Sequence, residues 1–324
     1  MRLLLLLALA GVCSGQHRLH AVGVTTRDWV VGKPLLPGGL FVKADGGEWR
    51  NPGHRHPYMM GLAWLAEAPG TLFAAAGNGV IRITPDGRWR ILTGSDVTEL
   101  RDISAGAGGA LVFGHTAGLR MSLDRGETWK ELSAGLHRKY VNAVRADRTK
   151  AGRIVAGTEE GLFVSEDGGG KWAPAGAMGF QAMHIEQSPH DGRVWLAVTE
   201  QGGLFRSGDG GRTFENAGNV GVGRNLYDIA FDATDAKRIA VGGWGPGVQV
   251  SEDGGKTWAA RNAGLPRPDV WSLAFDPDHA GRLYAAVHEE AVYVSEDAGR
   301  TWKEDGLKGS IVYRMFFVPA GGAQ

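Results

Sequence analysis

The sequence predicts an all-β protein folded as a single seven-bladed β-propeller, and three observations support this prediction. A motif of the form Ser-x-Asp-x-Gly-x-x-aromatic recurs along the chain at a nearly constant interval. Short apolar stretches bounded by turn residues lie between its copies, and none has convincing helical periodicity. Glycine accounts for 52 of the 324 residues, roughly twice the ordinary usage of about 7%, while the hydrophobic fraction of 43% is typical of folded chains.

The repeated motif sets the number of blades. Two degenerate copies come first, with Asp45 before Trp49 and Asp86 before Trp89. The seven aspartates are then 41, 38, 43, 42, 44 and 44 residues apart, and about 40 residues are enough for one four-stranded blade. The five complete copies contain Ser122, Asp124 and Trp129; Ser165, Asp167 and Trp172; Ser207, Asp209 and Phe214; Ser251, Asp253 and Trp258; Ser295, Asp297 and Trp302.

The order of strands predicts how the ring closes. In the best-formed repeat, strands are expected over 270–275, 282–287 and 291–295, and Trp302 opens a fourth. After the last motif, the segment 311–318 matches the innermost strand of a blade, while the N-terminal part supplies the other three strands. We therefore expect one blade to be assembled from both termini, which removes the exposed edges of an open sheet.

The motif itself is interpreted as a structural device. Its Ser and Asp side chains can bond turn backbone groups, its glycines can adopt positive φ, and its aromatic residue is expected to pack inward between blades. Each copy supplies one carboxylate, whereas a calcium ion needs six to eight oxygens. We therefore expect neither a metal nor a cofactor.

The start of the chain predicts export. Residues 1–15 contain one arginine, an apolar run from Leu3 to Ala10 and then small residues, the layout of a signal peptide. The run is too short to span a bilayer, so no transmembrane segment is expected. Residues 16–324 would form the propeller, in the periplasm or outside the cell. A lipid anchor at Cys13 is a less favoured alternative, because Val12 precedes this cysteine where a small residue is usual.

Charge excludes one class of partner. Lys and Arg number 35, as do Asp and Glu, and no run of five like charges provides a nucleic-acid arm. We expect a monomer that binds a protein or a glycan and no nucleic acid.

The complete motifs resemble those of the Asp-box (BNR-repeat) β-propeller superfamily, and the resemblance covers essentially the whole mature chain. The superfamily includes sialidases, xyloglucanases, the luminal domain of sortilin and the photosystem II assembly factor with its bacterial relatives, so it implies a fold and not one function. The Arg-Ile-Pro signature of sialidases is absent, since the nearest string is Arg82-Ile83-Thr84-Pro85. Xyloglucanases of this type use two tandem propellers, and sortilin adds a cysteine-rich module. Size, blade number and lack of cysteine are most similar to the assembly factor, which implies a scaffold.

Candidate binding residues lie on three predicted inner strands. Tyr227, Trp271 and Tyr313 occupy one register in adjacent repeats, and Arg224 and Arg314 lie next to them in the sequence. Aromatic and charged residues over a propeller channel can form a binding surface. The alternative is that the three aromatic residues form ordinary core with their apolar neighbours along the strands.

Candidate catalytic residues are fewer. Asp228, Glu289 and Glu290 lie near strand ends and outside the motifs, where a glycoside hydrolase would place its two carboxylates. The histidines near Tyr58, including His54, have no third ligand spaced to join them and are interpreted as solvated loop residues. The sequence thus favours an exported binding or assembly scaffold for a protein or glycan partner, with a glycoside hydrolase as the alternative.

Overall fold

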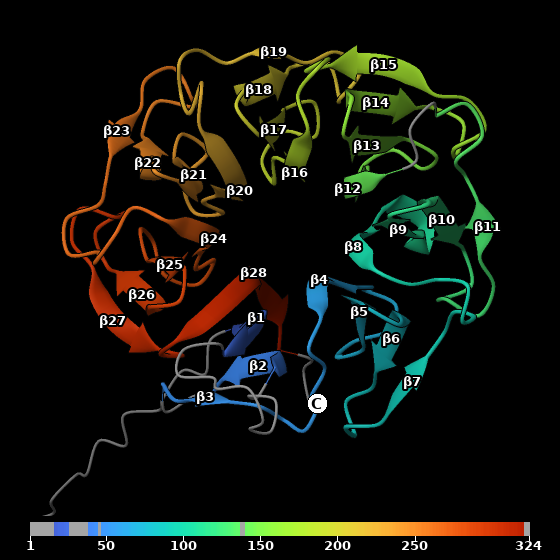
Figure 1. Cartoon of the computed structure of the whole chain (residues 1–324), viewed down its shortest axis with the longest axis horizontal. Coiled ribbons are helices and arrows are strands. Elements are labelled where there is room, and N and C mark those ends of the chain that lie inside the picture. Colours follow the sequence, from blue (N-terminus) through green and yellow to red (C-terminus); the bar gives the residue numbers. More distant parts are fainter. Residues whose placement is uncertain (1–15, 26–37, 45–46, 137–139, 321–324) are drawn as a thin grey trace, which may run out of the picture.

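Seven four-stranded antiparallel sheets are arranged as blades around a central axis in the computed structural model (Figure 1). The structure describes residues 16–25, 38–44, 47–136 and 140–320, so the predicted signal peptide and Asp45 lie outside the described residues. The only helical element in the described part is a 3-10 turn, η1 (Ala107–Gly109). None of the helices in that part is long and apolar enough to cross a membrane. The predicted all-β seven-bladed fold is confirmed.

In each sheet the innermost strand comes first along the chain, except in the sheet that closes the ring. From inside to outside, the sheets are sheet A, β28 (Ser310–Pro319), β1 (His17–Thr25), β2 (Gly38–Lys43) and β3 (Trp49–Arg50); sheet B, β4 (Met59–Trp64), β5 (Leu72–Ala76), β6 (Gly79–Ile83) and β7 (Trp89–Ile91); sheet C, β8 (Leu100–Ala105), β9 (Leu111–His115), β10 (Gly118–Ser122) and β11 (Lys130–Glu131); sheet D, β12 (Val141–Ala146), β13 (Ile154–Thr158), β14 (Gly161–Ser165) and β15 (Ala173–Gly176); sheet E, β16 (Ala182–Gln187), β17 (Trp195–Thr199), β18 (Gly203–Ser207) and β19 (Glu215–Asn216); sheet F, β20 (Asn225–Phe231), β21 (Ile239–Trp244), β22 (Gly247–Ser251) and β23 (Ala259–Ala260); and sheet G, β24 (Val270–Phe275), β25 (Leu283–Val287), β26 (Ala291–Ser295) and β27 (Lys303–Gly306).

Sheet A closes the ring from both ends of the described chain. Strand β28 pairs antiparallel with β1, so that Val22 lies opposite Arg314 and His17 opposite Pro319. The His17 side chain and its backbone N–H also contact Asp278 of sheet G, at 2.9 and 2.8 Å. The predicted pairing of N- and C-terminal strands is confirmed.

The hydrophobic core is divided among the seams between blades. Seven clusters of buried side chains are found in the described residues, and each draws on two neighbouring sheets. Strand alternation explains this division, because successive side chains point to opposite faces of a sheet and both faces meet a neighbour. Trp195, for example, is fully buried between sheets D and E.

The complete motifs have the expected turn bonds. In the second complete copy, the Ser165 hydroxyl donates to the Asp167 carboxylate at 2.9 Å and accepts the Gly169 N–H at 2.8 Å. Asp167 in turn accepts the backbone N–H of Lys171 at 2.9 Å. The other four complete copies repeat the serine bonds, with serine oxygen to glycine nitrogen distances of 2.7 to 2.9 Å.

The motif aromatics fill the seams, with one exception. Trp172 and Trp302 donate their indole N–H to the preceding blade, at Leu132 O and Arg261 O, both at 2.8 Å. Trp89 was expected to pack inward in the same way, and this prediction is wrong, since its side chain is 56% exposed. Trp89 lies opposite Ile83 in the ladder and therefore on the face toward sheet A. Its ring lies against residues of its own blade, in a hollow lined by Arg82, Pro85 and Arg90.

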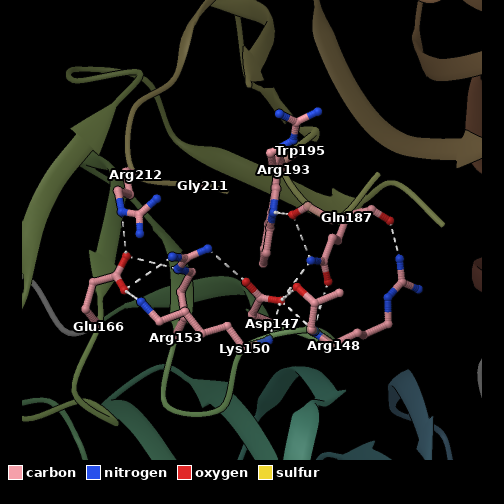
Figure 2. A network of polar contacts seen from close by, with 12 residues as sticks. Asp147, Arg148, Lys150, Arg153, Glu166, Gln187, Arg193, Trp195, Gly211 and Arg212 are labelled. Carbon is pink, nitrogen blue, oxygen red and sulfur yellow. Dashed lines mark hydrogen bonds and ion pairs between the residues drawn. The ribbon is translucent and has the colours of Figure 1, made fainter. Parts of the chain in front are cut away.

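Ion pairs link turns within and between blades (Figure 2). The buried Arg153 contacts Asp147 of its own turn at 3.1 Å and Glu166 at 2.9 Å. Arg212, from the motif of the next blade, reaches the same glutamate at 3.1 Å. Asp232 with Arg238, at 2.6 Å, and Asp276 with Arg282, at 3.4 Å, repeat the first contact within other blades, whereas the contact of Arg212 with Glu166 joins two blades.

Candidate functional site

A β-bulge occurs at the same place in all seven inner strands. In β20, for example, Leu226 lies opposite Gly243 and Asp228 opposite Gly242, which leaves Tyr227 as the extra residue. A bulge re-aims the side chain of the extra residue, so one position per blade is directed differently from its neighbours. The extra residues are Met60, Arg101, Asn142, Met183, Tyr227, Trp271 and Tyr313.

Three of these bulge residues form an aromatic cluster together with two residues from nearby strand ends. The rings of Tyr227 and Trp271 are stacked, with centroids 4.5 Å apart and an interplanar angle of 8°. Tyr313 meets Trp271 edge-on at 6.5 Å, and Trp244 does so at 6.4 Å. The Trp271 indole N–H donates to His288 Nδ1 at 2.7 Å. We call these five residues the aromatic cluster.

The aromatic cluster is not part of the core. Trp244 is 41% exposed, and the three bulge aromatics are half-buried, whereas the core neighbours Ile229 and Leu273 on the same strands are buried. Burial lowers the pKa of His288, which keeps its ring neutral, and the bond from Trp271 places the proton on Nε2. The cluster is thus a rigid, partly exposed aromatic surface without a charged ring.

A second aromatic group continues the rim across the ring. Arg101, the bulge residue of β8, donates to the Tyr58 hydroxyl at 2.6 Å and lies over the Tyr140 ring at 5.5 Å. Burial raises the pKa of the Tyr313 phenol, and Tyr58 and Arg101 are close enough to affect it as well. The rim therefore presents aromatic residues from sheets A, B, D, F and G.

Deeper in the channel, charged side chains line a cavity of about 300 Å³. Asp228 is 1% exposed and lies 2.7 Å from both Arg314 Nη1 and His184 Nδ1. Arg145 contacts His184 Nε2 at 2.6 Å and Glu186 at 3.0 Å. Since His184 Nε2 accepts from Arg145, its proton is on Nδ1, where it faces Asp228.

The carboxylates of this cavity are held ionised. Burial alone would raise the pKa of Asp228, but Arg314, His184 and the Leu273 backbone N–H hold it well below its ordinary value. For Glu186, burial is likewise outweighed by Arg145 and Arg148, and the pKa is lowered. Burial and then Arg314 lower the pKa of His184, so the imidazole is neutral.

Asp228 also has a structural task. Its carboxylate accepts the N–H of Ile229 on its own strand and of Leu273 on the next inner strand, at 2.9 and 2.8 Å. Asp102 of β8 repeats this arrangement: its carboxylate accepts the N–H of Ile103 on its own strand and of Val144 on the next inner strand, β12, at 2.9 and 3.0 Å. Buried acidic residues in this register therefore join neighbouring blades.

The other predicted site residues lie apart from the cavity. Glu289 and Glu290 occupy the turn between β25 and β26, where Glu290 pairs with Arg267 at 2.7 Å, and neither lines the cavity with Asp228. Arg224 is exposed and lines a different hollow beside Trp258. The structure thus brings together Tyr227, Trp271 and Tyr313, and separately Asp228 with Arg314. Glu289 lies 4.0 Å from His288 at the edge of the aromatic cluster, while Arg224 and Glu290 line neither group.

Sequence reasoning missed several members of both groups. Trp244 and His288 were not singled out, because they lie on second strands or turns and not in the shared inner-strand register. His184, Arg145 and Glu186 were missed although they stand near or after the bulge position, which aligning all seven inner strands would have revealed. No cluster of three metal-ligating side chains is found in the part of the chain that the structure describes.

The fold and this rim define a seven-bladed β-propeller with an aromatic surface at one mouth of its channel. No protein-family model matches the sequence, and no curated protein is similar to it in sequence. Among solved structures, the chain is similar to a GH74 xyloglucanase from Xanthomonas campestris, with a TM-score of 0.65 and 16% identity over 77% of this chain and 45% of that one. It is also similar to YCF48 from Cyanidioschyzon merolae, with a TM-score of 0.60 and 17% identity over 82% of this chain and 93% of that one. A structure of YCF48 bound to a D1 peptide has a TM-score of 0.57 and 18% identity over 76% of this chain and 81% of that one.

These similarities establish the propeller fold. The chain spans less than half the length of the xyloglucanase it matches and most of the length of YCF48.

Proposed function

We propose that this protein is an exported binding scaffold of the Asp-box superfamily that holds a protein or glycan partner on the aromatic cluster. The observation that carries the proposal is the stack of Tyr227 on Trp271, with the half-exposed Trp244 at its side. Export rests on the signal-peptide pattern of residues 1–15, and superfamily membership on the repeated motif with its recurring turn bonds.

The geometry favours binding because little conformational entropy would be lost when a partner binds the aromatic cluster. Its rings are already fixed by mutual contact and by the Trp271 to His288 bond, so a partner would not have to freeze them. Rigid Trp and Tyr side chains dominate many binding surfaces, and their faces suit both apolar side chains and the C–H faces of sugars. YCF48, which shares the fold, is known in complex with a D1 peptide, an example of a propeller of this size that binds a peptide.

The glycoside hydrolase alternative has weaker support. A glycosidase needs one carboxylic acid whose pKa is raised so that it can protonate the leaving group. In the channel, the pKa values of Asp228 and Glu186 are both lowered, and arginines already occupy their oxygens. The two other predicted carboxylates, Glu289 and Glu290, do not face this cavity.

The proposal is tested by glycan-array and peptide-array binding of residues 16–324. We expect the double variant Tyr227→Ala/Trp271→Ala to lose about 2 kcal/mol or more of binding free energy, roughly 30-fold in Kd. Trp89→Ala removes another exposed aromatic residue, on the outer strand of sheet B, and is expected to bind as the wild type does. Equal binding by the double variant and the wild type, or no ligand on either array, would contradict the proposal.

A further inference from the structure

Two carboxylates border the aromatic cluster without a cationic partner among the described residues. Glu200, in the turn between β17 and β18, forms a backbone bridge with Asn225, two residues before Tyr227. Asp269, immediately before β24, forms a second backbone bridge with Trp244. Both acidic side chains are half-buried, and neither forms an ion pair with the residues that the structure describes. Two uncompensated negative charges therefore lie at the edges of the cluster.

These carboxylates act on the rings of the cluster. Burial raises the pKa of the Tyr227 phenol, and Glu200 and Asp269 both raise it further. At the other edge, a third carboxylate, that of Glu289, lies 4.0 Å from His288 Nε2. Aromatic faces attract cations through the ring quadrupole, and negative charge beside the rings adds Coulomb attraction. The field over the cluster therefore favours a cationic group.

Nearby basic residues leave these charges uncompensated. Arg267 pairs with Glu290 at 2.7 Å, and Arg224 lines a separate hollow. The expectation that His54 is a solvated loop residue is wrong, since it is 7% exposed. Burial lowers the pKa of both His54 and His288, so neither ring is a competing cation.

An apolar surface continues beyond Glu200. Phe180 and Val222 are both exposed, and both lie against the turn that carries Glu200. The Cγ of Phe180 is 2.6 Å from the position that a Cβ would take on Gly202, and the Cγ2 of Val222 is 3.1 Å from the same position on Gly203. A glycan needs polar groups to bond its hydroxyls, and these two side chains have none, whereas they suit apolar side chains of a peptide. This surface therefore favours a polypeptide.

We propose that the aromatic cluster binds a basic polypeptide segment of a partner protein, with a lysine or arginine side chain over the rings between Glu200 and Asp269. Apolar residues next to that cation contact Phe180 and Val222. Tryptophan is the strongest partner for a cation, and Trp244 is the most exposed ring of the cluster. The inference rests on the proposed function of the cluster and names the chemistry of its partner.

The test begins with an array of eight-residue peptides, varied at every position and probed with residues 16–324. We expect the retained peptides to contain lysine or arginine next to an apolar residue. In fluorescence anisotropy with one of them, Glu200→Gln and Asp269→Asn should each weaken binding roughly threefold, and both together roughly tenfold. Glu215→Gln, which neutralises an exposed carboxylate on the outer strand β19, is the matched control and should bind as the wild type does.

Two further measurements separate the parts of the surface. Phe180→Ser/Val222→Ser should weaken the same peptide by at least threefold, because it removes the apolar contact. Raising the salt concentration from about 50 to 500 mM should weaken binding by the wild type more than by the Glu200→Gln/Asp269→Asn variant, because screening acts on charges that the variant lacks. Replacing the cation of the peptide by citrulline, which is neutral and similar in shape to arginine, should weaken binding roughly tenfold.

The outcomes distinguish this inference from the proposed function. Retention of neutral or acidic peptides or of glycans, or equal binding of a basic peptide by the wild type and by Glu200→Gln/Asp269→Asn, would overturn the inference and leave the binding function of the cluster. Full binding by Tyr227→Ala/Trp271→Ala would overturn both. Retention of peptides only by a chain whose residues 27–36 are replaced by glycine and serine would show that this segment is the occupant, and retention by neither chain would equally refute the inference.

Discussion

Two tryptophans in equivalent motif positions are expected to differ sharply in their effect on stability. Trp302 is 8% exposed and packs in the cluster between sheets F and G, where its indole also bonds Arg261 O. Burying a tryptophan removes about 150–250 Å² from water, which at about 25 cal/mol per Å² is roughly 4–6 kcal/mol as an upper value. Trp302→Ala should therefore lower the free energy of unfolding by about 3–5 kcal/mol. Trp89→Ala, at 56% exposure, should lower it by under about 1 kcal/mol.

Urea unfolding of residues 16–324, followed by circular dichroism and by tryptophan fluorescence, measures both variants. Coincident transitions by the two probes would permit a two-state comparison of midpoints. A loss for Trp89→Ala as large as that for Trp302→Ala would refute the reasoning, because it would mean that Trp89 is packed in solution.

Three further predictions follow from the polar contacts. Ser251→Ala leaves the Gly255 N–H without its acceptor and should cost about 1–3 kcal/mol in urea unfolding, and an unchanged midpoint would contradict this. Arg314→Met removes a positive charge near His184 and should raise the pKa of that histidine in an NMR titration, while an unchanged pKa would show that the two do not interact. The free energy of unfolding should decrease in two stages as the pH is lowered. Below about pH 6.5, histidines such as His184 become protonated in the unfolded chain, while burial keeps them neutral in the folded one. Between about pH 4 and 2, the stabilising contribution of the ionised Asp209 is lost, because hydrogen bonds from Ser207 and Thr213 outweigh its slight burial and lower its folded-state pKa to about 2. A flat thermal midpoint from pH 8 to 3 would contradict both stages.

The fold was predictable because each copy of the motif specifies a turn through contacts within a short segment of the sequence. Each Ser251-type turn forms its own bonds within eight residues, and the spacing between turns fixes how many strands each blade contains. Even the closure of sheet A was predictable, since the missing inner strand at one end of the chain matches the surplus strand at the other. The exposure of Trp89 was not, because whether a motif ring enters the seam depends on its packing against the neighbouring blade, which the motif itself does not encode.

The candidate sites were only partly predictable for a related reason. Tyr227, Trp271 and Tyr313 share a register, and the register is visible in the sequence. Trp244 and His288 reach the same surface from a second strand and a turn, so their proximity requires the three-dimensional arrangement of two blades. The channel network is harder still to foresee, because Asp228 and Arg314 are 86 positions apart and meet only across the ring.

In a fold made of repeats, the positions that repeat and the positions that depart from the repeat have different explanations. The turn serines and aspartates recur in five blades, and pairs such as Asp147 with Arg153 (Figure 2) recur in several, because they satisfy polar groups of the turns; they therefore indicate stability and not a ligand. The departures have no such requirement. Aromatic bulge residues occur in sheets A, F and G while other blades carry methionine, asparagine or arginine there, and one seam lacks the ring that others contain. Specific binding requires a surface that differs from the rest of the repeat, and the aromatic bulge residues of sheets A, F and G are therefore where we place the proposed binding function of this propeller.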